Sequence, residues 1–157
     1  MYDALTLLHL IAAIVWMGGM AFLLLALRPA ALAELEPQPR ARLMAAVLKR
    51  FFPLVAVCVV VLLATGGHLY SSAFRAAKAA TGVGSVPLGW SLMAGIGLLM
   101  ALIFGHLYLA GLRKFQRAVS AAEWPLANRA AAQMHTLVLA NFVLGWLAIA
   151  AVRLLHP

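Results

Sequence analysis

Four uninterrupted apolar runs constrain this chain more than any other feature of its sequence. They cover residues 4–27, 51–70, 88–111 and 131–152. A helix rises about 1.5 Å per residue, so about 20 residues cross the roughly 30 Å hydrocarbon core of a bilayer. Each run is long enough to do so, and the connections are too short for another domain. The sequence therefore predicts an all-α integral membrane protein, with one four-helix transmembrane domain over residues 1–157.

The composition excludes the class of water-soluble globular proteins. Hydrophobic residues make up 66% of the chain and charged residues only 10%, whereas soluble domains are about 45–50% apolar. The formal net charge of +8 would suggest nucleic-acid binding in a soluble protein. Here the basic residues lie between the apolar runs, where membrane topology and lipid headgroups explain them. We therefore expect membrane lipids, and no nucleic acid, as partners.

The basic residues also predict the orientation of the helices. Of the twelve Lys and Arg, five lie in the first connection and four in the third. Connections rich in Lys and Arg remain on the cytoplasmic side of a membrane. The sequence therefore predicts that the first and third connections are cytoplasmic and that both termini lie outside, an N-out, C-out topology.

Each apolar run contains one histidine, and the four histidines fall at two depths. His9 and His68 lie near the predicted outer ends of their helices, and His106 and His135 lie near the inner ends. An ionisable side chain inside a membrane usually faces the bundle interior, where it has a partner or a cofactor. Imidazoles on facing helices form a suitable axial pair for haem iron.

These positions predict a b-type cytochrome that moves electrons between two haem levels. We expect His9 and His68 to hold an outer haem b, and His106 and His135 to hold an inner one. A single haem is the alternative if the helix order separates one pair. A histidine whose ring points into lipid would be removed from the scheme. In the remaining alternative, the histidines only form hydrogen bonds between helices of a non-catalytic membrane subunit.

Copper is the competing metal. Met17, Met20 and the only cysteine, Cys58, lie inside predicted helices, and thioether and thiolate sulfur are soft ligands suited to Cu(I). His9 could join them. The alternative function is therefore copper handling, although the chain lacks a dense methionine cluster in an entry loop.

Three further polar residues have expected roles. Asn141 lies in the middle of the fourth run and needs a hydrogen-bond partner on another helix. Arg28 and Arg50 flank apolar runs and are candidates to pair with haem propionates; their alternative is to extend into the lipid headgroups.

Helical spacing predicts two inward faces. Residues three or four positions apart share one face of a helix. Large apolar side chains on these faces would line the bundle interior. The two predicted inward faces consist of His9, Ala13, Trp16 and Met20 in the first run, and of His135, Leu139, Phe142 and Trp146 in the fourth.

Several segments resemble a known family. Residues 9–20 (HLIAAIVWMGGM), residues 50–53 (RFFP) with 64–66 (ATG), and residues 141–145 (NFVLG) resemble the copper-resistance D (CopD) family and, more distantly, the HemJ membrane proteins of haem biosynthesis. This resemblance implies a multi-pass protein of the bacterial inner membrane in which His9 is a functional position. The first family implies copper, and the HemJ branch implies haem b.

The two-level arrangement of histidines also resembles an architecture, that of the small four-helix di-haem cytochrome b proteins. Those proteins exchange electrons between quinone and an external partner such as superoxide. The likeness implies a quinone and a periplasmic redox partner for this chain, in the role of a haem-dependent membrane oxidoreductase.

Overall fold

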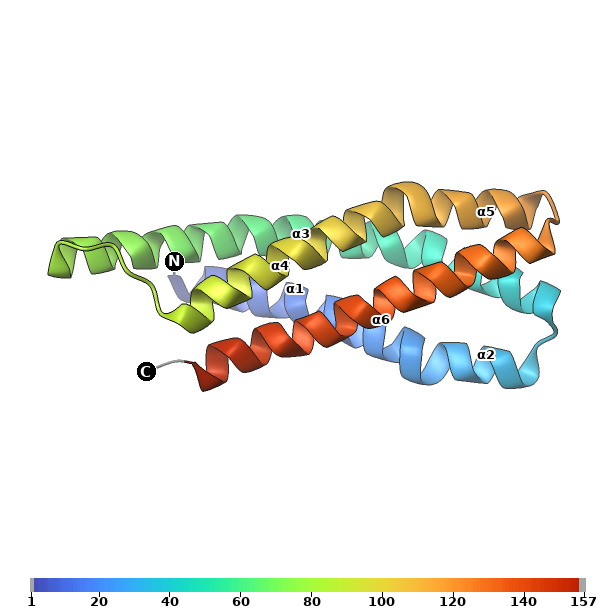
Figure 1. Cartoon of the computed structure of the whole chain (residues 1–157), viewed down its shortest axis with the longest axis horizontal. Coiled ribbons are helices and arrows are strands. Elements are labelled where there is room, and N and C mark those ends of the chain that lie inside the picture. Colours follow the sequence, from blue (N-terminus) through green and yellow to red (C-terminus); the bar gives the residue numbers. More distant parts are fainter. Residues whose placement is uncertain (1, 156–157) are drawn as a thin grey trace.

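In the part of the chain that the structure describes, the fold is all-α, as predicted, with four helical rods long and apolar enough to span a membrane. The computed structural model describes residues 2–155 (Figure 1). Each of the first and third rods consists of two α-helices joined by a short π-helix. In chain order the segments are α1 (Tyr2–Phe22), η1 (Leu23–Leu27), α2 (Arg28–Glu34), α3 (Pro37–Thr81), α4 (Leu88–His106), η2 (Leu107–Gly111), α5 (Leu112–Ser120) and α6 (Trp124–Leu154).

The rods are longer than the apolar runs that predicted them. α3 has 45 residues, which corresponds to about 67 Å at the usual helical rise. It begins at Pro37 rather than near residue 51, and Pro53 lies inside it. Hydropathy marks where a helix is apolar, not where it ends, and residues 40–50 are mostly strong helix formers. The apolar runs therefore mark the membrane-length parts of the helices, and the helices continue past these runs at their polar ends.

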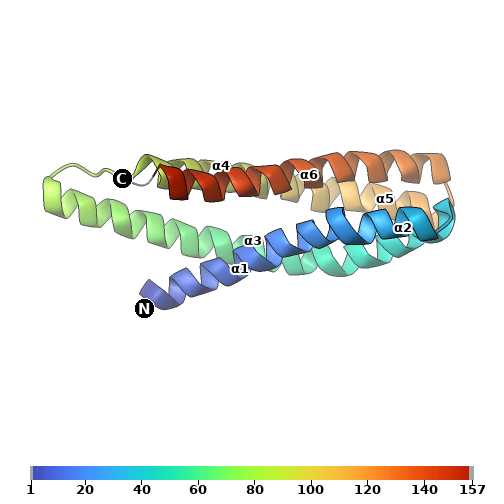
Figure 2. The ribbon, with the colours of Figure 1, turned by 90° about the horizontal axis from the view of Figure 1, so that it is seen from below.

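One end of the bundle carries most of the positive charge. It is formed by α2, the first part of α3, α5 and the start of α6, which lie together in both views (Figures 1 and 2). We call it the basic end. The two ends of the described chain lie toward the opposite end, as an even number of spans requires. The structure contains no membrane, so the predicted N-out, C-out orientation stays a prediction.

The chain consists of two halves with the same order of elements. In each half an α-helix, a five-residue π-helix and a shorter α-helix are followed by a turn and a long helix with proline in its first turn. α1 packs against α3, and α4 packs against α6. Buried positions also correspond at nearly constant sequence separation. Examples are Leu23 and Leu107, Ala41 and Ala127, Leu48 and Met134, Val55 and Asn141, and Val59 and Gly145.

One predicted inward face is confirmed, and the other is wrong at two of its four positions. Trp16 and Met20 on α1 are buried, as expected. On α6, however, Leu139 and Trp146 are 44% and 57% exposed. The buried face of α6 contains Met134, Asn141, Gly145 and Ala148 instead. Spacing cannot distinguish a core-facing apolar stripe from a lipid-facing one, because lipid and protein core are similarly apolar.

The two halves differ at the basic end. In the second half, α5 packs against both α6 and α3, and its Leu112, Phe115 and Ala118 are buried. In the first half, α2 buries only Ala31 and is packed much more loosely. This difference leaves room between α2 and α6.

Candidate functional site

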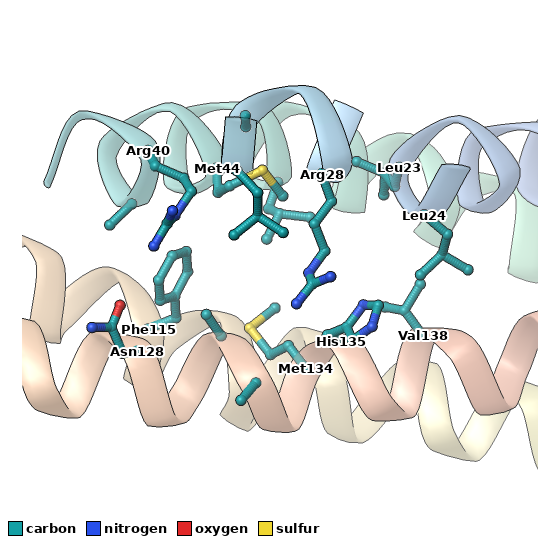
Figure 3. Close-up of a pocket in the computed structure, with 16 residues that line it drawn as sticks. Leu23, Leu24, Arg28, Arg40, Met44, Phe115, Asn128, Met134, His135 and Val138 are labelled. Carbon is teal, nitrogen blue, oxygen red and sulfur yellow. The ribbon is translucent and has the colours of Figure 1, made fainter. Parts of the chain in front are cut away.

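A cavity of about 280 Å³ occupies the space between α2 and α6 at the basic end (Figure 3). Its walls also come from η1, α3 and α5. Most of the lining is apolar, and the polar side chains are few. They are Arg28 from α2, Arg40 from α3, and Asn128 and His135 from α6. Convergence of a few polar groups in an apolar cavity is typical of ligand sites.

The two arginines in this cavity have no acidic partner. Both side chains are half-buried, and within residues 2–155 neither forms a side-chain hydrogen bond or an ion pair. The guanidinium of Arg28 points across the cavity toward His135 (Figure 3). Partial burial of an unpaired cation is unfavourable, and a bidentate anion such as a carboxylate or phosphate relieves it. The cavity is therefore suited to an anionic group.

Comparison of the halves shows how the cavity arises. Arg28 is the first residue of α2, and the buried Leu112 is the first residue of α5, so the two occupy equivalent positions in the two halves. Ala31 stands at the fourth position of α2, where α5 has Phe115, which is 1% exposed. In the second half these two large apolar side chains fill the equivalent space. In the first half an arginine and a small residue leave it open and make it positively charged.

His9 lies in a different environment, at the opposite end of the bundle. Its ring Nδ1 is 2.8 Å from Oγ1 of Thr65 on α3. The Thr65 hydroxyl donates its only proton to the carbonyl of Val61, at 2.6 Å. Nδ1 of His9 must therefore be the donor to Thr65, so a neutral ring carries its lone pair on Nε2. A hydrogen bond of this kind, from the ring nitrogen that does not bind the metal, orients many metal-ligating histidines.

The structure does not bring the predicted histidine pairs together. His9 contacts Thr65 and Gly66, whereas the side chains of His68 and His106 are exposed. None of the three cavities described here is lined by His9, His68 or His106. Of these three cavities, only the one of about 280 Å³ at the basic end is lined by a histidine, His135. The ligation of two haems by His9 with His68 and by His106 with His135 stays a prediction that this arrangement does not favour.

The hydrogen bond from His9 gives a first testable expectation. Replacement of Thr65 by Val leaves the Nδ1–H group without an acceptor, and we expect a loss of about 0.5–2 kcal/mol in the free energy of unfolding, the range for hydrogen bonds in membranes. Thr65→Ser keeps the hydroxyl and should therefore retain most of the wild-type free energy of unfolding. Thermal unfolding in detergent measures both, with Thr136→Val on exposed α6 surface as the control. Equal stability of the Val and Ser variants would contradict the assignment.

The residues of the copper alternative are only partly assembled. Met17 and Met100 both lie against Gly145, where an added Cβ would collide with Sδ of Met17. Met20 lines a separate cavity of about 10 Å³, and Cys58 is a buried free thiol on α3. Among residues 2–155, no three His, Cys, Asp or Glu side chains lie close enough to bind one metal ion.

Asn141 forms the interhelical hydrogen bond that its position predicts. Its Nδ2 donates to the Met100 carbonyl on α4 at 3.2 Å. The side chain is 1% exposed, and its Oδ1 has no hydrogen-bond partner. Asn141 lines the 10 Å³ cavity together with Trp16 and Phe104. The amide NH₂ of Asn141 therefore has a hydrogen-bond partner, whereas its amide oxygen is buried without one.

Comparisons of the chain with models of protein families, with curated proteins and with solved structures find no match. The chain is a multi-pass membrane protein by the length and composition of its four helical rods. Membership of the CopD or HemJ families stays a prediction.

Sequence reasoning identified part of the cavity. It singled out His135 and named Arg28 as a partner for haem propionates, but it paired Arg28 with Arg50, which is exposed. It missed Arg40. The signal that could have found the cavity is the correspondence between the halves, in which Arg28 replaces the apolar Leu112.

Proposed function

We propose that this protein is a membrane cytochrome b that holds one haem in the basic-end cavity, with His135 as an iron ligand. The observation that carries the proposal is the presence of two half-buried, unpaired arginines, Arg28 and Arg40, in the same cavity as His135. Haem b presents an iron atom, an apolar macrocycle and two carboxylates, and the lining offers a group for each.

The chemistry of the lining fits this cofactor. An imidazole is the commonest protein ligand of haem iron, and a guanidinium binds a carboxylate through two parallel hydrogen bonds. The remaining walls are apolar. The thioether of Met44, on α3, also lines the cavity, and thioether sulfur is a known type of ligand for haem iron.

The volume places a condition on binding. About 280 Å³ lies just below the 300–1,000 Å³ range of typical ligand pockets, and a haem is larger than this cavity. Binding therefore requires one wall to move outward. α2 is the loosely packed wall, so we expect α2 to be the element that moves.

A haem b bound here would supply one-electron transfer. The chain's own residues then have separate tasks. His135 would hold the iron, Arg28 and Arg40 would bind the carboxylates, and the apolar walls would exclude water. The redox partner we propose is a quinone in the bilayer of a bacterial inner membrane, because the basic end lies on the predicted cytoplasmic side, away from an external partner such as superoxide.

The test compares two histidine variants. We expect His135→Ala to lower the haem b content of purified protein at least about tenfold, because the iron loses its ligand. His106→Ala removes an exposed imidazole ring outside the cavity and should retain haem. Pyridine haemochrome absorbance measures the content in both. Equal haem loss in the two variants would contradict the single-cavity site.

Copper is a second candidate, favoured by the approach of Met17 and Met100 on different helices to the same point at Gly145. Elemental analysis of the same purified wild-type sample distinguishes the two. Protein that contains stoichiometric copper and no haem absorbance would select copper handling.

A further inference from the structure

A second hollow in the surface lies outside the bundle, along the outer side of α5. This α5 groove has a volume of about 450 Å³ and runs from the end of η2 to the first turn of α6. Its polar lining consists of Arg113, Lys114, Arg117 and Glu123, and Leu109 and Leu126 lie at its two ends. It shares no lining residue with the cavity of His135.

The charges in the α5 groove are unbalanced. Arg113, Lys114 and Arg117 are exposed, and in the described part of the chain none of them forms an ion pair. Glu123 is the only acidic residue in the lining. α5 is strongly amphipathic, since its Leu112 and Phe115 are buried on the opposite side. The three cations therefore present a fixed positive surface on a helix that the core holds in place.

The depth of these cations matches one layer of a bilayer. The apolar run of α4 and η2 ends at residue 111, and Arg113 to Arg117 follow about 3–9 Å farther along the helix. The polar headgroup layer is about 5–8 Å thick on each side of the hydrocarbon core. Leu109, 60% exposed, lies on the hydrocarbon side of the same groove. A ligand that spans both levels has a phosphate next to an acyl chain.

We propose that the α5 groove is a binding site for one anionic phospholipid, whose phosphate and anionic headgroup contact Arg113, Lys114 and Arg117 while an acyl chain lies against Leu109. The site does not depend on the proposed haem. Basic clusters directly beyond a transmembrane segment attract anionic lipid, and this groove adds a shaped, partly apolar surface to that attraction.

The test is native mass spectrometry of the full-length protein in detergent, titrated with phosphatidylglycerol or with phosphatidylcholine. We expect wild type to bind one phosphatidylglycerol in preference to phosphatidylcholine. The variant Arg113→Gln/Lys114→Gln/Arg117→Gln should lose that affinity by on the order of a hundredfold at low ionic strength. The matched control, Arg75→Gln/Lys78→Gln/Arg153→Gln, removes the same charge from the opposite end and should bind as wild type does.

Three results would overturn the proposal. Equal loss in both triple variants would mean a net-charge effect without a site. Displacement of the lipid by soluble glycerol 3-phosphate would mean that the groove binds a free phosphate. If wild type does not prefer phosphatidylglycerol to phosphatidylcholine, the groove is not a site for anionic lipid, and an acidic protein surface becomes the candidate occupant. If the triple variant fails to fold, Glu123→Gln tests the same site by removing its negative charge instead of its positive charges. This variant should raise the affinity for phosphatidylglycerol about fivefold.

Discussion

A double variant that gives α2 the side chains of α5, Arg28→Leu/Ala31→Phe, is expected to fold normally and to lose its haem. Leu112 and Phe115 fill the equivalent position in the second half of the chain and are buried there. The same pair in α2 should fill the cavity with compatible apolar volume and remove one of its two cations. We expect at least about a tenfold loss of haem b, since both space and charge are lost.

The control for this variant is Arg129→Leu/Ala33→Phe. It makes the same two changes at exposed positions outside the cavity lining, so net charge and added volume are matched. Thermal unfolding and gel filtration report whether each variant folds, and haemochrome absorbance reports haem. Retention of haem by a folded Arg28→Leu/Ala31→Phe protein would show that the cofactor binds elsewhere.

Phe115→Ala is expected to have the largest effect on stability. Phe115 is 1% exposed on α5, which packs against both α6 and α3. Truncation of a fully buried phenylalanine costs about 3–5 kcal/mol in the free energy of unfolding, because transfer energy is lost and a cavity remains. The variant should unfold at a markedly lower temperature in detergent.

The control is Phe74→Ala, which removes the same side chain where it is 41% exposed. We expect little change from it. Similar unfolding temperatures for the two variants would mean that α5 is not part of the cooperative core. That result would also remove the structural basis for comparing α2 with α5.

The fold was predictable from the sequence because its main cause is local. Each apolar run is long enough to cross a bilayer. A single membrane-spanning segment can satisfy its own backbone hydrogen bonds only as a helix. The helix ends were not predictable in this way. Residues 40–50 are polar enough to lie outside a membrane, yet their helical propensity continues α3 without a break.

The site was only partly predictable because it depends on rotation about the helix axis. The sequence fixes how deep His68 and His106 lie along their helices, but each residue turns the helix by about 100°, and packing decides which direction faces the core. Both proved to be exposed. The cavity of Arg28 and His135 depends on how loosely α2 packs, a property of the whole bundle and of no single motif.

The most direct measurement is the number of haems b per chain in detergent-purified wild-type protein, by pyridine haemochrome absorbance against total protein. One basic-end cavity with His135 and two arginines predicts about one haem per chain. A value near zero would contradict haem binding altogether. A value near two would contradict the single-cavity site and return His9, His68 and His106 to consideration as iron ligands.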